Sequence, residues 1–520
     1  MSDEATRGFP VVLTADRTLM AAYSLLMDGM VSASQTTSTP GLIWRTLLAP
    51  GINGGLRARQ APLGVRRVEA ALVAGGFGEE DVAVVTPEEL PRAIGPRTRV
   101  IGLSSGDPLG IGMSSSTMTA LSGGEILCGA QFRRLAGRAR AIADGLGPGG
   151  PRVVMGGPGA WQLTGSAEHR ARLGIDHVVS GYCEDDIASL FGRLVEGEDT
   201  EPVVRCSYGQ AESIPAIRGA TVMGVVEISR GCGMGCDFCT LARLPMRHLD
   251  VDRIVADVQT NLAAGVKSIS LISEDLFRYG AAAAAKPAPE RLKSLVRAVR
   301  DLADVRLIQV DHANISSVAA FGDDDLAEVH DLMAGESGAG ALWINLGVET
   351  AAGELLEMNG GAAKMRPFGA AEWGDACREQ VLRASRSGFL PMVSLVVGME
   401  GETEEHIRRT IAWVESLADE RASVFPVFRV ATQEGEGEGA GTGAGRHFTE
   451  SDMTPLHWRL FEVSYRLNFR WISELYARGL AGGGAGVLRR ALMKVLGKIE
   501  AGRLGRRLRR LARGGNGRAG

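Results

Sequence analysis

Three of the seven cysteines in this 520-residue chain lie within eight residues, at Cys232, Cys236 and Cys239. An odd number of cysteines argues against a disulfide framework. A structural zinc site would need a fourth ligand, and no second cysteine pair or histidine pair follows nearby. Three thiolates with this spacing suit an iron–sulfur cubane instead, because a tight loop can place each sulfur on a different iron. Three glycines in the segment allow such a loop: Gly231, Gly233 and Gly235.

The residues around the cysteines predict a strand, a loop and a helix. Residues 222–229 are mostly apolar and predict a buried strand, and the pattern over 252–264 predicts a helix. The cysteines therefore lie on a loop after a strand, where α/β barrels carry their chemistry. With Phe238 before the last cysteine, the segment resembles the CxxxCxxC signature of the radical S-adenosylmethionine (radical SAM) superfamily. The resemblance implies a partial (β/α)6 barrel over residues 222–430, with the three cysteines as catalytic ligands of a 4Fe-4S cluster.

Three later segments resemble further parts of that superfamily. Residues 267–275 resemble the second strand and its acidic end, which binds the amino group of SAM. Residues 341–350 resemble a strand that ends in Gly-x-Glu-Thr, and 393–403 resemble the late strand that lines the adenosine pocket. Within this last segment, Glu402 fits a carboxylate at a helix N-terminus better than a ligand contact. The resemblance assigns cofactor-binding roles to four residues: Phe238, Glu274, Glu349 and Gly398.

The chemistry that this resemblance implies is reductive. The cluster passes one electron to SAM, which cleaves to methionine and a 5′-deoxyadenosyl radical that abstracts hydrogen from an unactivated carbon. An electron donor such as flavodoxin or ferredoxin and a small-molecule substrate are the implied partners. Four residues of the barrel loops are unranked candidates for substrate contact: Tyr279, Asp311, His312 and Asn314.

Between residues 61 and 200, short apolar strands alternate with helical patterns. This order predicts a doubly wound, Rossmann-like parallel sheet, whose ligand should lie at the carboxyl ends of the strands. A dinucleotide fold is the alternative, but no Gly-x-Gly-x-x-Gly follows the first strand. The pattern instead resembles the cobalamin-binding domain that precedes the barrel in one radical SAM subfamily. That resemblance assigns cobalamin contacts to two loops: Ser104, Ser105, Gly156 and Gly157.

The sequence departs from many cobalamin proteins in one respect. None of its eight histidines lies in the Asp-x-His-x-x-Gly motif that supplies a lower axial ligand to cobalt. Either cobalamin binds here without a histidine ligand, or the domain has kept the fold and lost the cofactor. Asp16 follows an early apolar run, where a turn carboxylate is favoured over a ligand contact.

The remaining segments are assigned by composition. A helix rich in aromatic residues is expected over residues 454–478, as core packing or as a lid. The last 34 residues carry eleven Lys or Arg against Glu500 alone, within a chain of 57 basic and 61 acidic residues. This basic tail would make a weak contact with an anionic surface, either membrane or nucleic acid, or extend into solvent. Four expected segments flank the two domains: an N-terminal extension packed on the first domain (1–60), a linker (201–221), a Gly/Glu linker (431–446) and a C-terminal helical region (447–520).

Four functions are weighed for this chain. The favoured one is cobalamin-dependent C-methylation of a small molecule or natural product by a radical SAM methyltransferase, and a cyclase or rearrangement enzyme without methyl transfer is the alternative. An RNA methylthiotransferase would need three clustered N-terminal cysteines, and here they are scattered. A non-catalytic sensor would not need the complete cysteine motif. No apolar run reaches the roughly 20 residues that span a membrane, and no signal peptide is evident, so a cytoplasmic location is expected.

Overall fold

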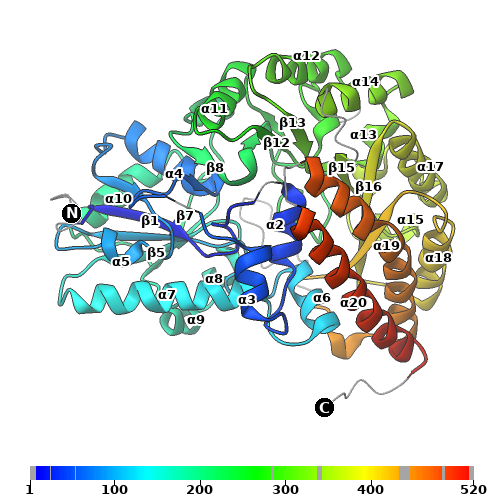
Figure 1. The fold of residues 1–520 in the computed structure, drawn as a ribbon, viewed down its shortest axis with the longest axis horizontal. Coiled ribbons are helices and arrows are strands. Elements are labelled where there is room, and N and C mark those ends of the chain that lie inside the picture. Colours follow the sequence, from blue (N-terminus) through cyan, green and yellow to red (C-terminus); the bar gives the residue numbers. More distant parts are fainter. Residues whose placement is uncertain are drawn as a thin grey trace.

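Six parallel strands form the N-terminal sheet in the order β3-β1-β4-β5-β6-β7 (Figure 1). The computed structural model describes residues 8–23, 25–52, 54–282, 286–335, 342–431, 446–482 and 487–514. The chain order reverses between β1 and β4, which makes their carboxyl ends the switch point where doubly wound sheets bind ligands. The strands are β1 (Val11–Ala15), β3 (Val82–Val84), β4 (Val100–Ser104), β5 (Arg152–Gly156), β6 (His177–Ser180) and β7 (Val203–Arg205).

Helices cover both faces of this sheet, as its buried strands require. One core holds Leu72 of α4 and Phe191 of α10, and the other holds Leu90 of α5 and Phe132 of α7. Helices alternate with the strands along this part of the chain, as the sequence pattern predicts. The helices are α4 (Leu63–Ala74), α5 (Leu90–Ala93), α6 (Met113–Ser122), α7 (Leu127–Gly145), α8 (Trp161–Thr164), α9 (Ala167–Leu173) and α10 (Ile187–Val195).

The first sixty residues are not an extension packed on this domain. β1 pairs with both β3 and β4, so it is a central strand, and β7 adds an edge strand from the expected linker. Helix α2 (Leu26–Ala33) packs elsewhere, with Met27 against Met392 of the barrel. The boundary at residue 60 was wrong because parallel strands are joined by long crossovers, so the partners of β1 lie many residues later in the chain. Shorter elements of this region are α3 (Gly41–Ile43), a π-helical turn (Trp44–Leu48) and β2 (Gln60–Ala61), which pairs with β8 (Ala220–Thr221).

The second domain is an open parallel barrel. Strands β13-β12-β9 form one sheet and β14-β15-β16-β17 another, and Asp311 alone separates β13 from β14. Counting that interrupted strand once gives six positions, as a partial (β/α)6 barrel has. The strands are β9 (Val225–Glu227), β12 (Ser268–Ile272), β13 (Leu307–Val310), β14 (His312–Asn314), β15 (Leu342–Glu349), β16 (Phe389–Val397) and β17 (Ser423–Phe428).

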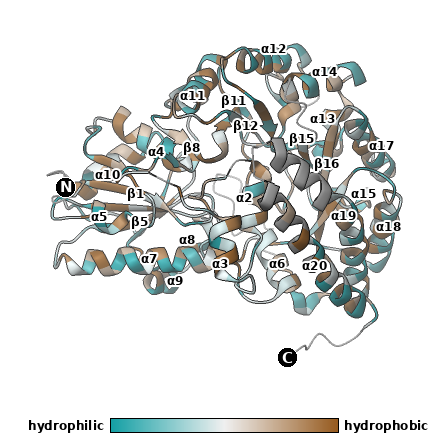
Figure 2. Ribbon diagram, in the orientation of Figure 1, coloured by the Kyte–Doolittle hydropathy of each residue, from teal (hydrophilic) through white to brown (hydrophobic). Residues whose placement is uncertain are grey.

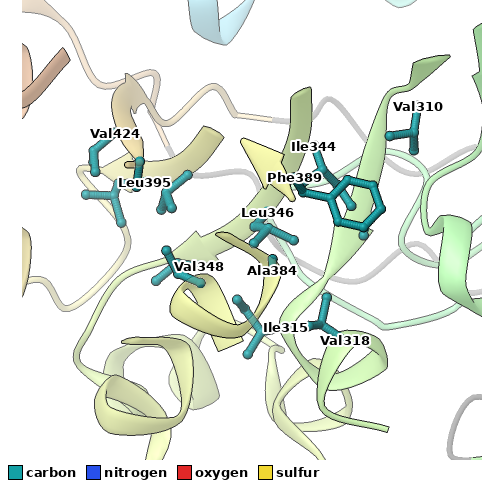
Figure 3. Close-up of a cluster of buried hydrophobic side chains, with 14 of the residues drawn as sticks. Val310, Ile315, Val318, Ile344, Leu346, Val348, Ala384, Phe389, Leu395 and Val424 are labelled. Atoms are coloured by element: carbon teal, nitrogen blue, oxygen red, sulfur yellow. The ribbon is translucent and has the colours of Figure 1, made fainter. Parts of the chain in front are cut away.

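Apolar side chains fill the layer between these strands and the outer helices. Figure 3 shows part of this core, where residues of β15 and β16 meet Ile315 and Val318 of α13. The hydropathy colouring of Figure 2 shows brown strands inside and teal patches on the surrounding helices. The barrel helices are α11 (Val251–Ala263), α12 (Pro289–Arg300), α13 (Ile315–Ala319), α14 (Asp323–Ala334), α15 (Gly353–Met358), α16 (Ala362–Met365), α17 (Trp373–Arg386) and α18 (Glu404–Glu415).

The first barrel strand is shorter than the sequence predicts. Residues Val222–Gly224 form a 3-10 turn, and β9 begins at Val225. Met223 and Gly224 both have positive φ, at 60° and 61°, which a strand cannot accommodate. A Cβ at Gly224 would lie 2.1 Å from the Ser268 carbonyl oxygen, so close approach to β12 requires glycine here.

Two long helices follow the barrel, α19 (Pro455–Gly482) and α20 (Val487–Ala512), and they lie side by side (Figure 1). The aromatic residues Trp458 and Phe461 of α19 are buried in the core, as the packing alternative expected. The basic tail is helical rather than extended in solvent, because Leu504 and Leu508 on one face of α20 are buried. No described helix is long and apolar enough to cross a membrane. The expected linker 431–446 lies outside the described residues except at its two ends.

Candidate functional site

The cysteine loop is closed by its own backbone. Strands β10 (Ser229–Arg230) and β11 (Arg247–His248) pair antiparallel at its base. Within the loop, the Cys232 amide donates to the Leu244 carbonyl oxygen at 2.9 Å. Gly231 has φ of 77°, and a Cβ there would lie 2.4 Å from the Pro245 carbonyl oxygen. The glycines that the sequence singled out therefore make this turn possible.

All three thiols of the loop are free and at least half-buried. Burial raises the pKa of Cys236 to about 12 and that of Cys239 to about 11. Backbone amides of Met234 and Leu241 hydrogen-bond to the sulfurs of Cys232 and Cys239, which favours their thiolate forms. In the described part of the chain, no three His, Cys, Asp or Glu side chains converge on one metal ion. Free thiols with amide donors to sulfur fit the ligand set of an iron–sulfur cluster.

A buried lysine that the sequence analysis missed lies beside the cluster loop. The Nζ atom of Lys364, on α16, is 2.6 Å from Oε1 of Glu349, and both side chains are more than nine-tenths buried. Burial disfavours the charge, but Glu349 and the Cys236 and Cys232 sulfurs outweigh it and raise the pKa of Lys364. The lysine charge in turn favours the thiolate form of all three cysteines. Lys364 lies in a Gly-Gly-Ala-Ala segment that carries no motif, so nothing in the sequence marks it.

Glu349 occupies a strained position at the end of β15. Its φ is +66°, and the register shifts between Gly347 and Glu349. A Cβ on Gly347 would lie 2.6 Å from Nζ of Lys364, so this glycine makes room for the ion pair. A positive φ in a non-glycine residue costs free energy and is concentrated at functional sites. The carboxylate faces Lys364, and its assigned role as a cofactor ligand stays a prediction.

The two acidic residues after β12 have different surroundings: Asp275 is held within the fold, and Glu274 lies near the cysteine loop. Asp275 is fully buried and accepts hydrogen bonds from Asn314 Nδ2 at 3.0 Å and Ser317 Oγ at 2.7 Å. Glu274 is less buried and lies within electrostatic range of Cys232 and Cys239. Burial raises the pKa of Glu274. Its predicted place near the SAM amino group is compatible with this position.

The four candidates for substrate contact also differ in whether the fold already engages their polar groups. Tyr279 donates to the Leu249 carbonyl oxygen and Asn314 to Asp275, so both are occupied by the fold. His312 is 42% exposed, and its Nδ1 lies 2.9 Å from Asp311 Oδ2. Burial opposes its charge, but Asp311 and Glu274 outweigh burial and raise the pKa of His312 to about 9. The Asp311–His312 pair is therefore still available for substrate contact, at the break between β13 and β14.

The last two barrel assignments pack against other parts of the chain. Phe238 is buried in the main core. The Gly398 amide donates to Glu402 Oε2 at 2.9 Å, and the same oxygen lies 2.9 Å from Nε2 of His457 on α19. Glu402 is therefore engaged within the fold, but not as a helix carboxylate: Thr403 is the N-cap of α18, and Glu402 joins Gly398 to α19. At Gly398, whose φ is +83°, a Cβ would collide with Phe448, and a contact of this glycine with adenosine stays a prediction.

The predicted cobalamin loops dock against one another at the switch point. The Ser105 amide donates to the Gly156 carbonyl oxygen at 3.2 Å. Gly157 has φ of +95°, and a Cβ there would lie 2.5 Å from Ser104 Oγ. Ser105 Oγ is buried and donates to Asp16 Oδ2 at 3.3 Å, so this hydroxyl holds its loop to Asp16. Gly106, between the two loops' contacts, is exposed, and an added Cβ there would meet no atom within 4 Å.

Asp16 lies at the carboxyl end of β1, where its carboxylate also accepts a 2.9 Å hydrogen bond from the Thr18 amide. Burial outweighs these bonds and raises the pKa of Asp16 from 3.8 to about 6. The folded state therefore binds this proton more tightly than the unfolded chain does, and the resulting stability is lost as the pH rises through about 6.

We expect Asp16→Asn, which keeps an acceptor but cannot ionise, to lose this pH dependence. Between pH 4 and pH 7, wild type should lose folding stability on the order of 3 kcal/mol, and the variant should not. Urea unfolding midpoints at four pH values measure the difference. Parallel profiles for the two proteins would show that Asp16 ionises normally.

Segments that follow three strands of the N-terminal sheet contact the carboxyl-terminal ends of barrel strands. The Leu26 amide donates to Gln309 of β13 at 3.0 Å, and Thr117 Oγ1 accepts from the Phe428 amide of β17 at 2.8 Å. Arg230, one residue before the cysteine loop, lies 2.8 Å from Glu184, which follows β6. The ligand-binding edges of the two sheets therefore face the same interface.

Arg230 is the centre of a buried charge network at this interface. Its guanidinium also contacts Glu227 at 2.8 Å and lies 4.1 Å from the ring centroid of Tyr182. The side chains of Arg230, Glu184 and Glu227 are at most 10% exposed. The network joins the loop after β6 directly to the base of the cysteine loop.

Comparison with known proteins identifies the barrel. Residues 226–414 match the family model described as the radical SAM superfamily, so this part of the chain is a radical SAM domain. Among curated proteins, the chain is 25% identical over 240 residues to the ribosomal protein uS12 methylthiotransferase RimO of Acaryochloris marina, covering 45% of this chain and 48% of that protein. The RimO of Sorangium cellulosum is 29% identical over 240 residues, 45% of each chain. The chain spans about half the length of the curated relatives it matches.

A solved structure resembles much more of the chain. The radical S-adenosylmethionine methyltransferase TsrM of Kitasatospora setae, with tryptophan substrate and a SAM analogue bound, aligns with a TM-score of 0.51 and 16% identity. The alignment covers 81% of this chain and 73% of that one. A second structure of the same protein, with cobalamin and a [4Fe-4S] cluster bound, gives the same TM-score. The likeness shows that the two domains described above share the TsrM fold.

Proposed function

We propose that this radical SAM enzyme methylates a carbon atom of a small-molecule substrate with the help of cobalamin. The observation that carries the proposal is the shared interface of the two parallel sheets, where segments after β1, β4 and β6 contact the barrel ends. Ligands of both folds bind at those ends. Two cofactors placed there would act on one substrate between them.

The chain's own residues suit the two cofactors. When bound, the cluster supplies the electron that cleaves SAM, and cobalamin supplies methyl-carrying chemistry. Lys364 gives one of its three ammonium donors to Glu349, which leaves two for an anionic group of a ligand near the thiols. Glu274 offers an opposite charge near the same thiols. Glu274 therefore suits the amino group of SAM, and Lys364 suits an anionic group of either ligand.

Resemblance to TsrM supports cobalamin, because its structure was solved with cobalamin and a [4Fe-4S] cluster. The structure of this chain supports that cofactor through the docked Ser105 and Gly156–Gly157 loops at the switch point of the sheet. Anaerobic purification with cobalamin supplied tests the proposal, with cobalt and iron content read together with the visible spectrum. Turnover with SAM and a reductant should then give S-adenosylhomocysteine, and its absence with every substrate tried would favour a cyclase or rearrangement enzyme.

Gly157→Ala is expected to lower bound cobalt several-fold while leaving iron unchanged. The added methyl would lie 2.5 Å from Ser104 Oγ in a backbone conformation that alanine adopts poorly, so the two loops must separate. Gly137→Ala on α7 is the matched control, because a Cβ there meets nothing within 4 Å. Equal cobalt in both variants would remove these loops from the cobalamin site.

A methylthiotransferase is the second candidate, because the curated relatives are RimO proteins. A second cluster would need three further cysteines close together. Cys128 contacts Ser115, whereas Cys183 and Cys206 lie together in another core, on the other side of the sheet. This separation does not support a second cluster, and the methyltransferase remains the better proposal.

A further inference from the structure

Arg429 is a buried cation with no counterion among the residues that the structure describes. It follows β17 directly and is 6% exposed. Its guanidinium makes no hydrogen bond or ion pair with any atom of the described residues, and its Nε atom is fully buried without a partner. Burial of an unpaired charge costs several kcal/mol, so proteins rarely keep one without a use.

Other buried arginines with an unpartnered Nε differ from Arg429. Arg67 reaches Asp257 at 2.6 Å, and Arg278 donates to the Cys232 carbonyl oxygen at 2.7 Å. Their charge or their remaining donors are therefore satisfied within the fold. Arg429 alone among them leaves all five donors of its guanidinium without an acceptor in the described part of the chain.

The position of Arg429 places it at the barrel interior. Along β17 the more accessible side chains alternate, at Phe425 and Val427, while Val424 and Phe428 face the outer core. The ladder continues one residue further, because the Arg429 amide donates to the Val397 carbonyl oxygen at 2.8 Å. By this alternation Arg429 shares the inner face with Phe425 and Val427. This is the carboxyl end of the last strand, beside Gly398.

The positive charge of Arg429 acts on a neighbouring histidine, His447. His447 accepts a 3.1 Å hydrogen bond from the Ala431 amide at Nδ1. Burial first, and then the Arg429 charge, lower the pKa of His447. Two acidic groups of the site are engaged elsewhere, since Glu349 pairs with Lys364 and Asp311 with His312, and Glu274 lies near the thiols of the cysteine loop.

We propose that Arg429 is the binding group for a carboxylate of the small molecule held at the barrel mouth. A planar guanidinium with free donors matches a carboxylate in bidentate geometry, and burial strengthens the pairing. The carboxylate comes either from SAM or from the substrate, and the inference rests on the proposed function in placing both there. Loss of such a charged hydrogen-bonded pair weakens binding roughly ten- to a hundredfold.

The test compares full-length, cluster-loaded wild type with Arg429→Met. Without ligand, Arg429→Met should unfold at a temperature a few degrees higher, because it removes an uncompensated buried charge. Arg67→Met, which breaks a buried pair with Asp257, should unfold at a lower temperature and serves as the contrast. A lower unfolding temperature for Arg429→Met would overturn the proposal and make the residue structural.

Binding measurements identify the source of the carboxylate. Two probe pairs are used under anaerobic conditions: SAM against decarboxylated SAM, and L-tryptophan against tryptamine, chosen because TsrM was solved with tryptophan. Wild type should prefer the carboxylate member of one pair by tenfold or more, and Arg429→Met should lose that preference, with Arg429→Lys intermediate. Loss in the first pair assigns the site to SAM, and loss in the second to the substrate. An unchanged preference in the variant, or none in wild type, overturns the proposal.

The same experiment separates this inference from the proposed function. If cobalt does not bind or no methyl group is transferred, the proposed reaction fails while the carboxylate preference of wild type persists. Iron content should be equal in wild type and both Arg429 variants, because Arg429 does not contact the cysteine loop in the described residues.

Discussion

Replacing Cys232, Cys236 and Cys239 together by alanine should abolish reductive cleavage of SAM and reduce bound iron to background. The three sulfurs are the ligands that the loop geometry presents, and no other described cysteine lies on that loop. A cluster that loses every protein ligand cannot be retained. The measurements are iron content after anaerobic reconstitution and 5′-deoxyadenosine formed from SAM and a strong reductant.

The matched control changes the same number of cysteines elsewhere. Cys128, Cys183 and Cys206 replaced by alanine should keep iron and SAM cleavage near wild-type values, since these thiols belong to the N-terminal domain. Normal SAM cleavage in the loop variant would refute the assignment of the cluster. Equal loss in both triple variants would show that the effect comes from folding rather than ligation.

Arg230→Met should destabilise the interface between the two domains by about 3–5 kcal/mol. Glu184 and Glu227 each lie 2.8 Å from this guanidinium and are at most 10% exposed, so the variant removes the nearest cation from two buried carboxylates. Glu184 then has no cation among the described residues, and Glu227 keeps only Arg67, whose Nε lies 4.0 Å from its Oε2. Because Arg230 immediately precedes the cysteine loop, we also expect lower iron occupancy. Urea unfolding midpoints and iron content measure the two effects.

Two further variants test that explanation. Arg408→Met breaks an exposed ion pair with Glu404 and should cost less than about 1 kcal/mol. Adding Glu184→Gln and Glu227→Gln to Arg230→Met should restore much of the stability, because the unpaired charges are then removed. If the triple variant is no more stable than Arg230→Met, lost packing of Arg230 on Tyr182 is the cause instead.

The carboxylates of the site show which contacts a local sequence pattern can predict and which it cannot. Glu274 could be predicted near the cluster because it ends a strand next to the one that carries the cysteines. Glu402 was expected at a helix N-terminus, but its contact is with His457, 55 residues later, which no local pattern indicates. Lys364 could not be predicted as a site residue, because its role comes from its contact with Glu349, which lies fifteen residues earlier, before a short helix. Ser105 was assigned to cobalamin, yet its hydroxyl faces Asp16, which lies 89 residues earlier.

Domain boundaries show the same limit. An apolar run such as Val11–Ala15 reads as a strand, but its two neighbours in the sheet come from residues 82–84 and 100–104. Helix α2 follows that strand and yet packs on the barrel through Met27. Pairing of distant segments depends on the whole packed arrangement, so no local pattern reveals it.

By itself, the sequence determined the chemistry that depends on residues close together in the chain. Three cysteines and three glycines in one short loop specify a cluster site, and alternating strands and helices specify two parallel sheets. Only the tertiary structure decided which charges meet: Lys364 with Glu349, Arg230 with Glu184 and Glu227, and Arg429 with no acid of the described residues. The reason is that buried charges are stabilised or left unpaired by segments that folding brings together from distant parts of the chain.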